Sequence, residues 1–162
     1  MIGNTPNPAA GPTTSPERLS SGILLGREPH EPTFTRNGKE LWVTLRGEDR
    51  IAILDVEQAT RQLTGQGDAA TSKAVRAYVP TLNGPAQVWF SKDGTLAFVI
   101  SQKVSQLEIL QVNPDAKGYS RPKRLRLVDL SPQDKPAFTP FQKLSPDGSQ
   151  MWLSHKLADA VS

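Results

Sequence analysis

The chain has 162 residues, of which 36% are hydrophobic, and a net charge of +3; its mean hydropathy is −0.43. It contains no cysteine, which excludes disulfides, thiolate metal sites and cysteine nucleophiles. No run approaches the roughly 18 apolar residues of a membrane-spanning helix, so the sequence predicts no membrane span.

Residues 1–20 are predicted to form a disordered or linker segment. Four prolines stand among Asn, Thr, Gly and Ala in the first sixteen residues, which carry no charged residue. This composition favours an extended chain without a core. No basic and apolar secretory signal follows Met1.

From residue 21 onward, one short pattern occurs three times. The copies are Phe34-Thr-Arg-Asn-Gly38, Phe90-Ser-Lys-Asp-Gly94 and Leu144-Ser-Pro-Asp-Gly148, with spacings of 56 and 54 residues between the glycines. A fixed period of this order indicates a repeat architecture. Four residues after each glycine comes an aromatic residue, for which we predict equivalent core positions between repeats: Trp42, Phe98 and Trp152.

Each repeat predicts short antiparallel strands in chain order. Asn-Gly or Asp-Gly suits a tight hairpin between a first and a second strand. Alternating apolar residues predict a third strand at Arg50–Asp55 and Gln106–Gln111. A fourth candidate strand precedes each copy, at 21–25, 73–79 and 125–130. No segment shows a helical period, and four short strands per unit are typical of a β-propeller blade.

The predicted fold is therefore all-β, a β-propeller fragment of about three four-stranded antiparallel blades within residues 21–162. The repeats lie near 27–56, 83–112 and 139–162, and we expect sheets over 31–56, 86–112 and 141–162. The last blade stops at Val161-Ser162 and is incomplete. Propellers have about four to eight blades, so we expect a fragment or truncated product whose missing blades come from a longer chain or from self-association.

The first copy resembles the YVTN-type β-propeller repeat proteins, a WD-like scaffold. The matching segments are Gly26-Arg-Glu-Pro29-His30, Asn37-Gly38, Leu41-Trp-Val43 and Ile53-Leu-Asp55. The resemblance covers roughly residues 21 to 162 and implies a propeller that serves binding proteins, lactonases and redox domains alike. It also implies a periplasmic or extracellular origin, because bacterial members are often exported. It leaves the cofactor open.

Blade topology directs the loops that lead into the inner strands, and the turns between second and third strands, to one rim. The candidate ligand-binding residues there are His30, Glu31, Arg46, Asp49, Gln87 and His155. His30 comes first because the resemblance places it at the family's Pro-His position, although its ring could instead bond the backbone of a neighbouring blade. We expect His155 to be exposed. Two histidines on different blades without a third ligand predict no metal site.

Two classes of function remain open. The first is a non-catalytic module that binds a protein or small molecule at the rim, since no Ser/His/Asp order, phosphate-binding loop or paired-histidine motif indicates a catalytic residue. The alternative is an enzyme or redox domain, lactonase-like or haem- or metal-binding, with His30 as ligand or base. The basic stretch from Lys117 to Arg126 contains only Tyr119 as an aromatic, which argues against nucleic-acid binding and favours a solvated edge.

Overall fold

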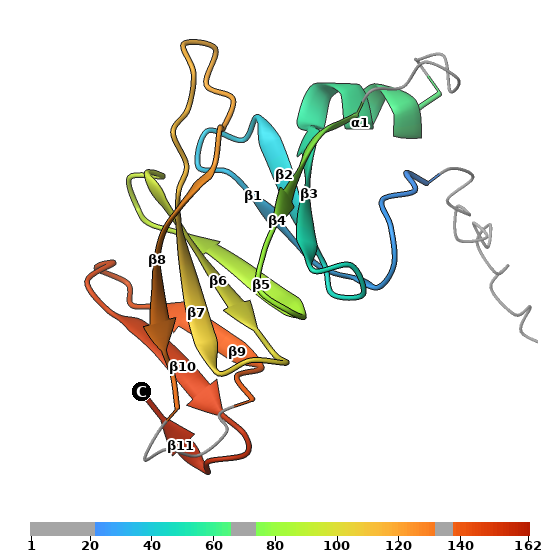
Figure 1. Ribbon diagram of the computed structural model, residues 1–162. Helices are drawn as coiled ribbons and strands as arrows, with labels where there is room; N and C mark the ends of the chain where they lie inside the picture. The colour runs from blue at the N-terminus through green and yellow to red at the C-terminus, as the bar shows by residue number, and fades with distance from the viewer. Residues whose placement is uncertain (1–21, 66–73, 132–137) are drawn as a thin grey trace, which may run out of the picture.

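The computed structural model describes residues 22–65, 74–131 and 138–162 (Figure 1). These residues form three antiparallel sheets of four, four and three strands. The prediction of an all-β partial propeller of about three blades is confirmed. The whole of the predicted linker at residues 1–20 lies outside the described residues, as does residue 21.

Each sheet is one blade, with its strands in chain order. Blade 1 consists of β1 (Pro29–Phe34), β2 (Glu40–Leu45), β3 (Arg50–Asp55) and β4 (Val75–Pro80). Blade 2 consists of β5 (Pro85–Phe90), β6 (Leu96–Ser101), β7 (Gln106–Gln111) and β8 (Lys123–Asp129). Blade 3 consists of β9 (Phe141–Leu144), β10 (Met151–His155) and β11 (Ala160–Val161).

The repeated Gly turns close the first hairpin of each blade. Gly38, Gly94 and Gly148 have φ values of 70°, 72° and 78°, a conformation that costs glycine little and other residues more. The Ser or Thr of the motif hydrogen-bonds the turn: in blade 2, Ser91 Oγ donates to Asp93 Oδ1 at 2.6 Å and accepts from Leu96 N at 3.0 Å. The pattern that recurs in the sequence is thus a structural turn.

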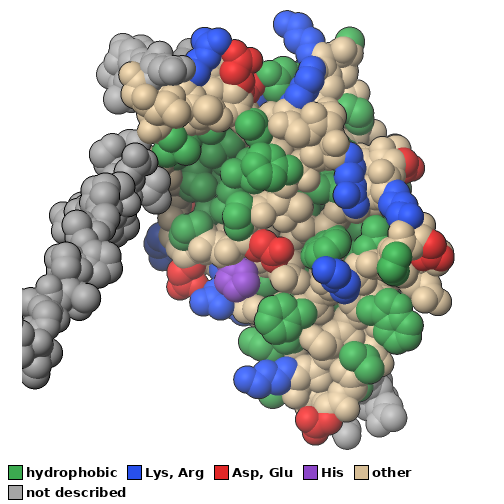
Figure 2. All heavy atoms as spheres, turned by 180° about the vertical axis from the view of Figure 1, so that it is seen from behind, with side chains coloured by type: hydrophobic (Ala, Val, Ile, Leu, Met, Phe, Trp, Pro, Cys, Tyr) green, Lys and Arg blue, Asp and Glu red, His purple; other side chains and the backbone are tan. Residues whose placement is uncertain are grey.

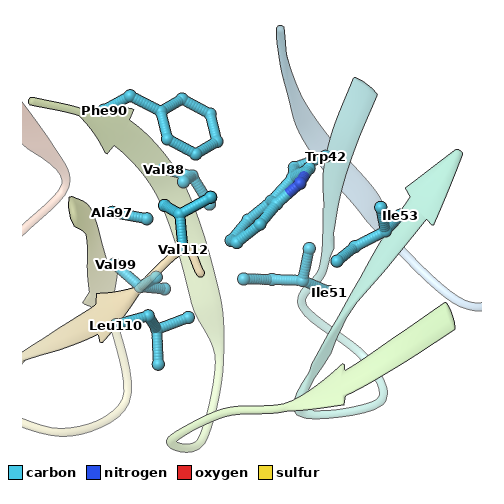
Figure 3. Close-up of a cluster of buried hydrophobic side chains, with 9 residues drawn as sticks. All are labelled: Trp42, Ile51, Ile53, Val88, Phe90, Ala97, Val99, Leu110 and Val112. Atoms are coloured by element: carbon cyan, nitrogen blue, oxygen red, sulfur yellow. The ribbon is translucent and has the colours of Figure 1, made fainter. Parts of the chain in front are cut away.

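The aromatic residues after these turns occupy one register position. Trp42, Phe98 and Trp152 pair with Thr33, Trp89 and Lys143 of the respective inner strands. Trp42 is fully buried and points from blade 1 toward blade 2 (Figure 3). There its ring meets Phe90 edge-on, with 5.0 Å between ring centroids. The equivalence predicted from the sequence is confirmed.

Core packing at this position depends on the neighbouring blade. Trp42 lies in a cluster between blades 1 and 2, and Phe98 is partly buried against a cluster between blades 2 and 3. Trp152 is 53% exposed, so the expectation that it is a core residue is wrong. No described blade covers the outer face of blade 3, which leaves that ring in solvent.

One helix was not expected from the sequence. α1 (Val56–Leu63) follows β3 directly, and the Asp55 side chain accepts from Gln58 N as its N-cap. Glu57 in the first turn and Arg61 in the last suit the helix dipole. Ala59 is buried against blade 1. The prediction of no helix is therefore wrong. The helix has only eight residues, too short a segment to show a clear helical period in the sequence, and it is stabilised by its N-cap and by the contact of Ala59.

The fourth-strand predictions differ in outcome. Those at 73–79 and 125–130 correspond to β4 and β8, shifted by one or two residues. The described part of the first, residues 22–25, forms no strand. Its Ile23 and Leu25 pack instead on the outer face of blade 1, against the cluster that includes Val43 and Leu45. Without partner strands this segment lacks the backbone hydrogen bonds of a sheet.

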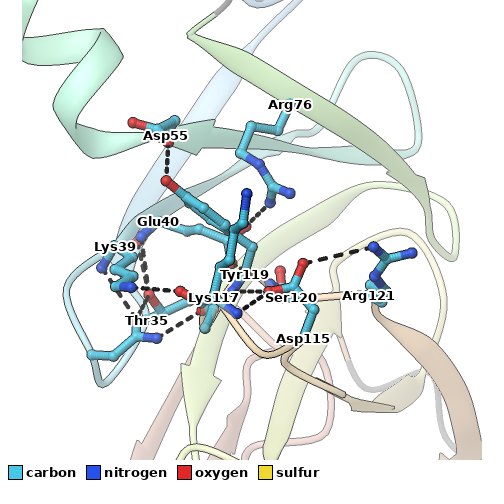
Figure 4. Close-up of polar contacts among 12 residues, drawn as sticks. Thr35, Lys39, Glu40, Asp55, Arg76, Asp115, Lys117, Tyr119, Ser120 and Arg121 are labelled. Carbon is cyan, nitrogen blue, oxygen red and sulfur yellow. Dashed lines mark hydrogen bonds and ion pairs between the residues drawn. The ribbon is translucent and has the colours of Figure 1, made fainter.

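A polar network joins blades 1 and 2 beside the start of β2 and the end of β3 (Figure 4). The fully buried Glu40 carboxylate forms an ion pair with Arg76 and accepts from Ser120 N at 3.0 Å. Tyr119 Oη donates to Asp55 Oδ2 at 2.6 Å, and the Arg76 guanidinium lies 4.1 Å from the centre of the Tyr119 ring. Tyr119 in the basic stretch therefore packs within the fold.

None of the helices in the described segments is long and apolar enough to cross a membrane.

Candidate functional site at the inner strands

The inner strands β1, β5 and β9 bring residues of all three blades together. β1 contacts β5, and β5 contacts β9. The view in Figure 2 shows hydrophobic side chains in patches on this side of the molecule, with charged side chains between them. Equivalent positions of successive inner strands carry Glu31, Gln87 and Phe141, and the polar groups of Glu31 and Gln87 meet between blades 1 and 2.

A chain of hydrogen bonds runs across these strands. The Gln87 side chain bonds the Glu31 carboxylate, and Gln87 Oε1 accepts from Gln142 N at 2.9 Å. Because the amide oxygen is engaged by Gln142, the amide nitrogen of Gln87 is the group that donates to Glu31. Gln142 is buried and held by donation from Nε2 to the carbonyls of Gln87 and Phe98, at 3.2 and 2.9 Å.

The environment of Glu31 makes it the strongest candidate base. Burial raises the pKa of the Glu31 carboxyl above its usual range, against the opposing effects of the Gln87 hydrogen bond and the nearby His30 ring. A carboxylate with a raised pKa is a better proton acceptor near neutral pH. Perturbed titration in a hollow of the surface is typical of functional sites.

Two hollows in the surface adjoin this hydrogen-bonded group of Glu31, Gln87 and Gln142. One, of about 270 Å³, is lined by residues of β1 and β5, which include Glu31, Phe34 and Trp89, and by Arg36 in the turn after β1. The other, of about 410 Å³, has a largely apolar lining that includes Gln87, Trp89, Phe141 and Trp152. Lys143 Nζ stands 4.8 Å from the centre of the Trp89 ring. Trp89 thus borders both hollows and offers a flat apolar ring beside the hydrogen-bonded side chains of Glu31 and Gln87.

His30 lies at the rim in the position expected, with its ring held by the next blade. His30 Nδ1 is 2.9 Å from the carbonyl oxygen of Ala86, so that nitrogen carries the proton in this contact. The residue is exposed and its other ring nitrogen, Nε2, remains for a ligand or proton exchange. Both the structural contact and the functional role considered for His30 are compatible with this geometry.

Arg46 and Asp49 are held by the rim itself. Arg46 donates to Glu28 Oε2 at 3.0 Å and to Gln102 Oε1 at 3.2 Å. Asp49 accepts from Asn83 Nδ2 at 3.1 Å and from the backbone of Gly84 at 2.9 Å. Arg46 therefore links blades 1 and 2, and Asp49 fixes the connection that leads into β5.

His155 differs from its expected state. It is 1% exposed, with Nδ1 3.0 Å from Thr139 Oγ1 and Nε2 2.7 Å from Ser162 Oγ. Burial lowers the pKa of its imidazole. The expectation of an exposed His155 is wrong, because the ring bonds the segment that leads into β9 and the residue that follows β11.

The structure brings together some predicted residues and adds others. Glu31 and Gln87 are hydrogen-bonded. His30 precedes Glu31 in the sequence, and its charge acts to lower the pKa of the Glu31 carboxyl. The sequence analysis missed Trp89 and Gln142, although the repeat offset that links Glu31 to Gln87 leads directly to the inner-strand positions beside them. Within the described ranges no three His, Cys, Asp or Glu residues are placed to hold a metal ion.

Comparisons with known proteins agree with this architecture. Solved structures with the same fold include the periplasmic gluconolactonase PpgL of Pseudomonas aeruginosa, at 22% identity and a TM-score of 0.59, covering 77% of this chain and 33% of that one. A putative 6-phosphogluconolactonase of Bacteroides fragilis has 20% identity and a TM-score of 0.60, covering 94% and 40%. The Swd1 β-propeller domain of Myceliophteria thermophila has 12% identity and a TM-score of 0.60, covering 78% and 36%.

The chain thus spans about a third to two fifths of the length of these structures. No curated protein shows a significant match. Residues 24–162 match the family described as lactonase, 7-bladed beta-propeller. This match covers most of the sequence and every described strand, so the chain belongs to the lactonase family of seven-bladed β-propellers.

Proposed function

We propose that these blades carry part of a lactonase site, in which Glu31 is the general base for hydrolysis of a sugar lactone. The observation that carries the proposal is the half-buried Glu31 carboxylate, with its raised pKa, held by Gln87 at the edge of a hollow. The family match and the similarity to a gluconolactonase and a putative 6-phosphogluconolactonase supply the substrate class. The enzyme alternative considered from the sequence is thus favoured over the non-catalytic module.

The chemistry asked of Glu31 is simple. The carboxylate takes a proton from water as the water oxygen attacks the lactone carbonyl carbon. The bond between that carbon and the ring oxygen then breaks, and the proton passes from Glu31 to the departing ring oxygen. The product is the open hydroxy acid, and Glu31 returns to its ionised state.

Other residues have positioning roles in this proposal. Gln87 donates to the Glu31 carboxylate and is itself oriented by Gln142, so the base is held in one direction. The Trp89 ring at the border of both hollows provides an apolar face on which a sugar ring can stack. His30 lies beside the base, where it can exchange protons or hold a polar group of the substrate.

The test compares two carboxylates of the same rim. Glu31→Gln is expected to lower kcat for gluconolactone hydrolysis by about 100-fold or more, the range typical of a general base. Glu28→Gln is the matched control, because Glu28 is exposed and its carboxylate pairs with Arg46 at the rim among the described residues. Its rate should stay within about twofold of the unchanged protein. Proton release at constant pH measures both, on the longest polypeptide that contains these blades.

The same variants separate catalysis from binding alone. A propeller that only binds the lactone would show saturable binding by calorimetry and no turnover, with Glu31→Gln changing affinity only. Turnover that survives Glu31→Gln unchanged would remove Glu31 as base. In that case His30→Gln would identify whether the neighbouring imidazole performs the step.

A further inference from the structure

The chain contains two Asn-Gly pairs, and the fold places them in different surroundings. Asn37-Gly38 lies in the hairpin turn between β1 and β2, and Asn83-Gly84 lies between β4 and β5. Both asparagine side chains are exposed. An asparagine before glycine is prone to cyclisation, because glycine has no Cβ to keep its backbone nitrogen away from the preceding side-chain amide. The groups that surround each pair decide which one reacts.

The Asp49 carboxylate contacts both nitrogens that take part in cyclisation at Asn83-Gly84. Asp49 Oδ1 accepts from Gly84 N at 2.9 Å, and Asp49 Oδ2 accepts from Asn83 Nδ2 at 3.1 Å. The nitrogen that attacks and the nitrogen that leaves therefore donate to the two oxygens of a single carboxylate. A hydrogen bond in the plane of the Gly84 amide does not block attack, because the attacking orbital is perpendicular to that plane.

The backbone holds Asp49 in this position. Asp49 has φ 52°, a conformation that is uncommon for residues other than glycine but tolerated by Asp and Asn. Its carbonyl accepts from Thr81 N at 2.9 Å, which ties the turn between β2 and β3 to the segment that carries Asn83. Gly84 has φ +71°, and an added Cβ would lie 2.8 Å from Lys103 Cγ. The site therefore requires glycine after Asn83 and a fixed carboxylate beside it.

The Asn37-Gly38 pair has backbone carbonyls in the places that the carboxylate occupies at the other pair. Gly38 N donates to the Thr35 carbonyl at 2.9 Å, and Asn37 Nδ2 donates to the Gly118 carbonyl at 2.8 Å. A neutral carbonyl accepts a hydrogen bond but does not take up a proton as a carboxylate does. Asn37-Gly38 is thus an internal control with the same dipeptide and no acid–base group at these two nitrogens.

We propose that Asn83-Gly84 is a self-modification site, at which Asp49 catalyses cyclisation of the asparagine to a succinimide. Gly84 N attacks Asn83 Cγ while its proton passes to the Asp49 carboxylate. The bond between Cγ and Nδ2 then breaks, Asp49 returns a proton to Nδ2, and ammonia leaves. Water opens the cyclic imide at either of its two carbonyl carbons and gives an aspartyl or an isoaspartyl linkage. No group is oxidised or reduced, and Asp49 ends in its ionised state.

The modification changes the connection that leads into the inner strand of blade 2. The isoaspartyl product has one extra methylene group in the main chain just before β5, and both products carry a carboxylate beside that of Asp49, which repels it. β5 holds the Ala86 carbonyl, which accepts from Thr44 Oγ1 and contacts His30 Nδ1 across the junction of blades 1 and 2. Cyclisation at Asn83 therefore acts on the contacts that fix one blade against the next.

The experiment follows both pairs in the same full chain by peptide mass spectrometry during incubation at neutral pH in water enriched in heavy oxygen. Each conversion replaces an amide by a carboxyl group with one oxygen from the solvent, and chromatography separates the isoaspartyl peptide from the aspartyl one. In the folded chain Asn83 is expected to convert about 10-fold or more faster than Asn37, a modest share of what proton-transfer catalysis contributes. In guanidinium chloride, where Asp49 is no longer held beside the pair, the two rates should become similar.

Asp49→Asn tests the role of the carboxylate. Asparagine tolerates the positive φ of this position and removes only the group that takes up the proton, so conversion of Asn83 should fall to the rate of Asn37. Loss of structure would have the opposite effect, because a loosened loop cyclises faster. Asn83→Gln, whose longer side chain closes a ring far more slowly, should show no conversion at position 83 and so assigns the product.

Two results would overturn the proposal. One is conversion of Asn83 no faster than that of Asn37 in the folded chain, and the other is an unchanged or faster conversion of Asn83 in folded Asp49→Asn. If circular dichroism shows that Asp49→Asn does not fold, the comparison of folded and unfolded unchanged chain decides alone. Hydrolysis of the lactone enters none of these readouts, so their failure is distinct from failure of the proposed function.

Discussion

Removal of the buried Trp42 ring should cost far more stability than removal of the equivalent exposed ring. Trp42 is fully buried and contacts Phe90, whereas Trp152 at the same repeat position is 53% exposed. Burial of about 200 Å² at about 25 cal/mol/Å² corresponds to ~5 kcal/mol. Large-to-small substitutions of this kind cost about 3 to 5 kcal/mol. We therefore expect Trp42→Ala to lower the free energy of unfolding by about 4 kcal/mol and Trp152→Ala by about 1 kcal/mol.

Urea unfolding followed by circular dichroism measures this difference. The shift of the transition midpoint, at unchanged slope, gives the difference in stability for each variant. Nearly equal costs for the two tryptophans, or a cost below about 1 kcal/mol for Trp42→Ala, would refute the assignment of the Trp42 cluster as the contact that joins blades 1 and 2.

Three further predictions concern stability. Burial lowers the pKa of His155, so the unfolded chain binds a proton more readily than the folded chain does. The melting temperature should therefore fall as pH drops from 7 to 5. His155→Gln should make the melting temperature depend less on pH, and an unchanged dependence would contradict this cause. Gly94→Ala should cost about 1 to 2 kcal/mol because Gly94 has φ +72°, whereas Gly22→Ala, with open space around it, should be nearly neutral by urea unfolding; similar costs would argue against turn strain. Glu40→Ala should lower the free energy of unfolding by about 3 kcal/mol because it breaks a buried ion pair. Glu57→Ala, which removes an exposed ion pair, should lower it by less than about 1 kcal/mol. Equal urea midpoints for the two variants would show that the Glu40 network is dispensable.

The fold was largely predictable because repetition reports register directly. A shared offset from a turn glycine fixes which residues lie opposite one another, so the equivalence of Trp42, Phe98 and Trp152 followed from counting. Exposure of Trp152 did not follow, because burial depends on the next blade and is not a property of the residue's own strand. Helix α1 was missed because its stabilisation comes from one cap and from Ala59 against blade 1, both weak signals in eight residues.

The candidate site was predictable only in outline. Topology placed Glu31 and Gln87 on one side, and the structure joins them by a hydrogen bond. The orientation of the Gln87 amide depends on its hydrogen bond with Gln142. Gln142 is buried between inner strands, and no local sequence pattern predicts that burial. His155 was predicted to be exposed because it is a polar residue at the end of a strand. Its burial depends on the segments that cover it, which contain Thr139 and Ser162 and which the local sequence does not place.

The dependence of lactone hydrolysis on pH tests the proposed role of Glu31 most directly. A general base must be ionised, so the rate should fall as pH drops through its pKa, and burial raises that pKa above 4.5. The profile of kcat/KM should therefore show an acid limb with its midpoint above this ordinary value, matched by the titration of the Glu31 carboxyl in NMR and lost in Glu31→Gln. An acid limb that persists in Glu31→Gln, or one at or below the ordinary carboxyl value, would contradict Glu31 as the base.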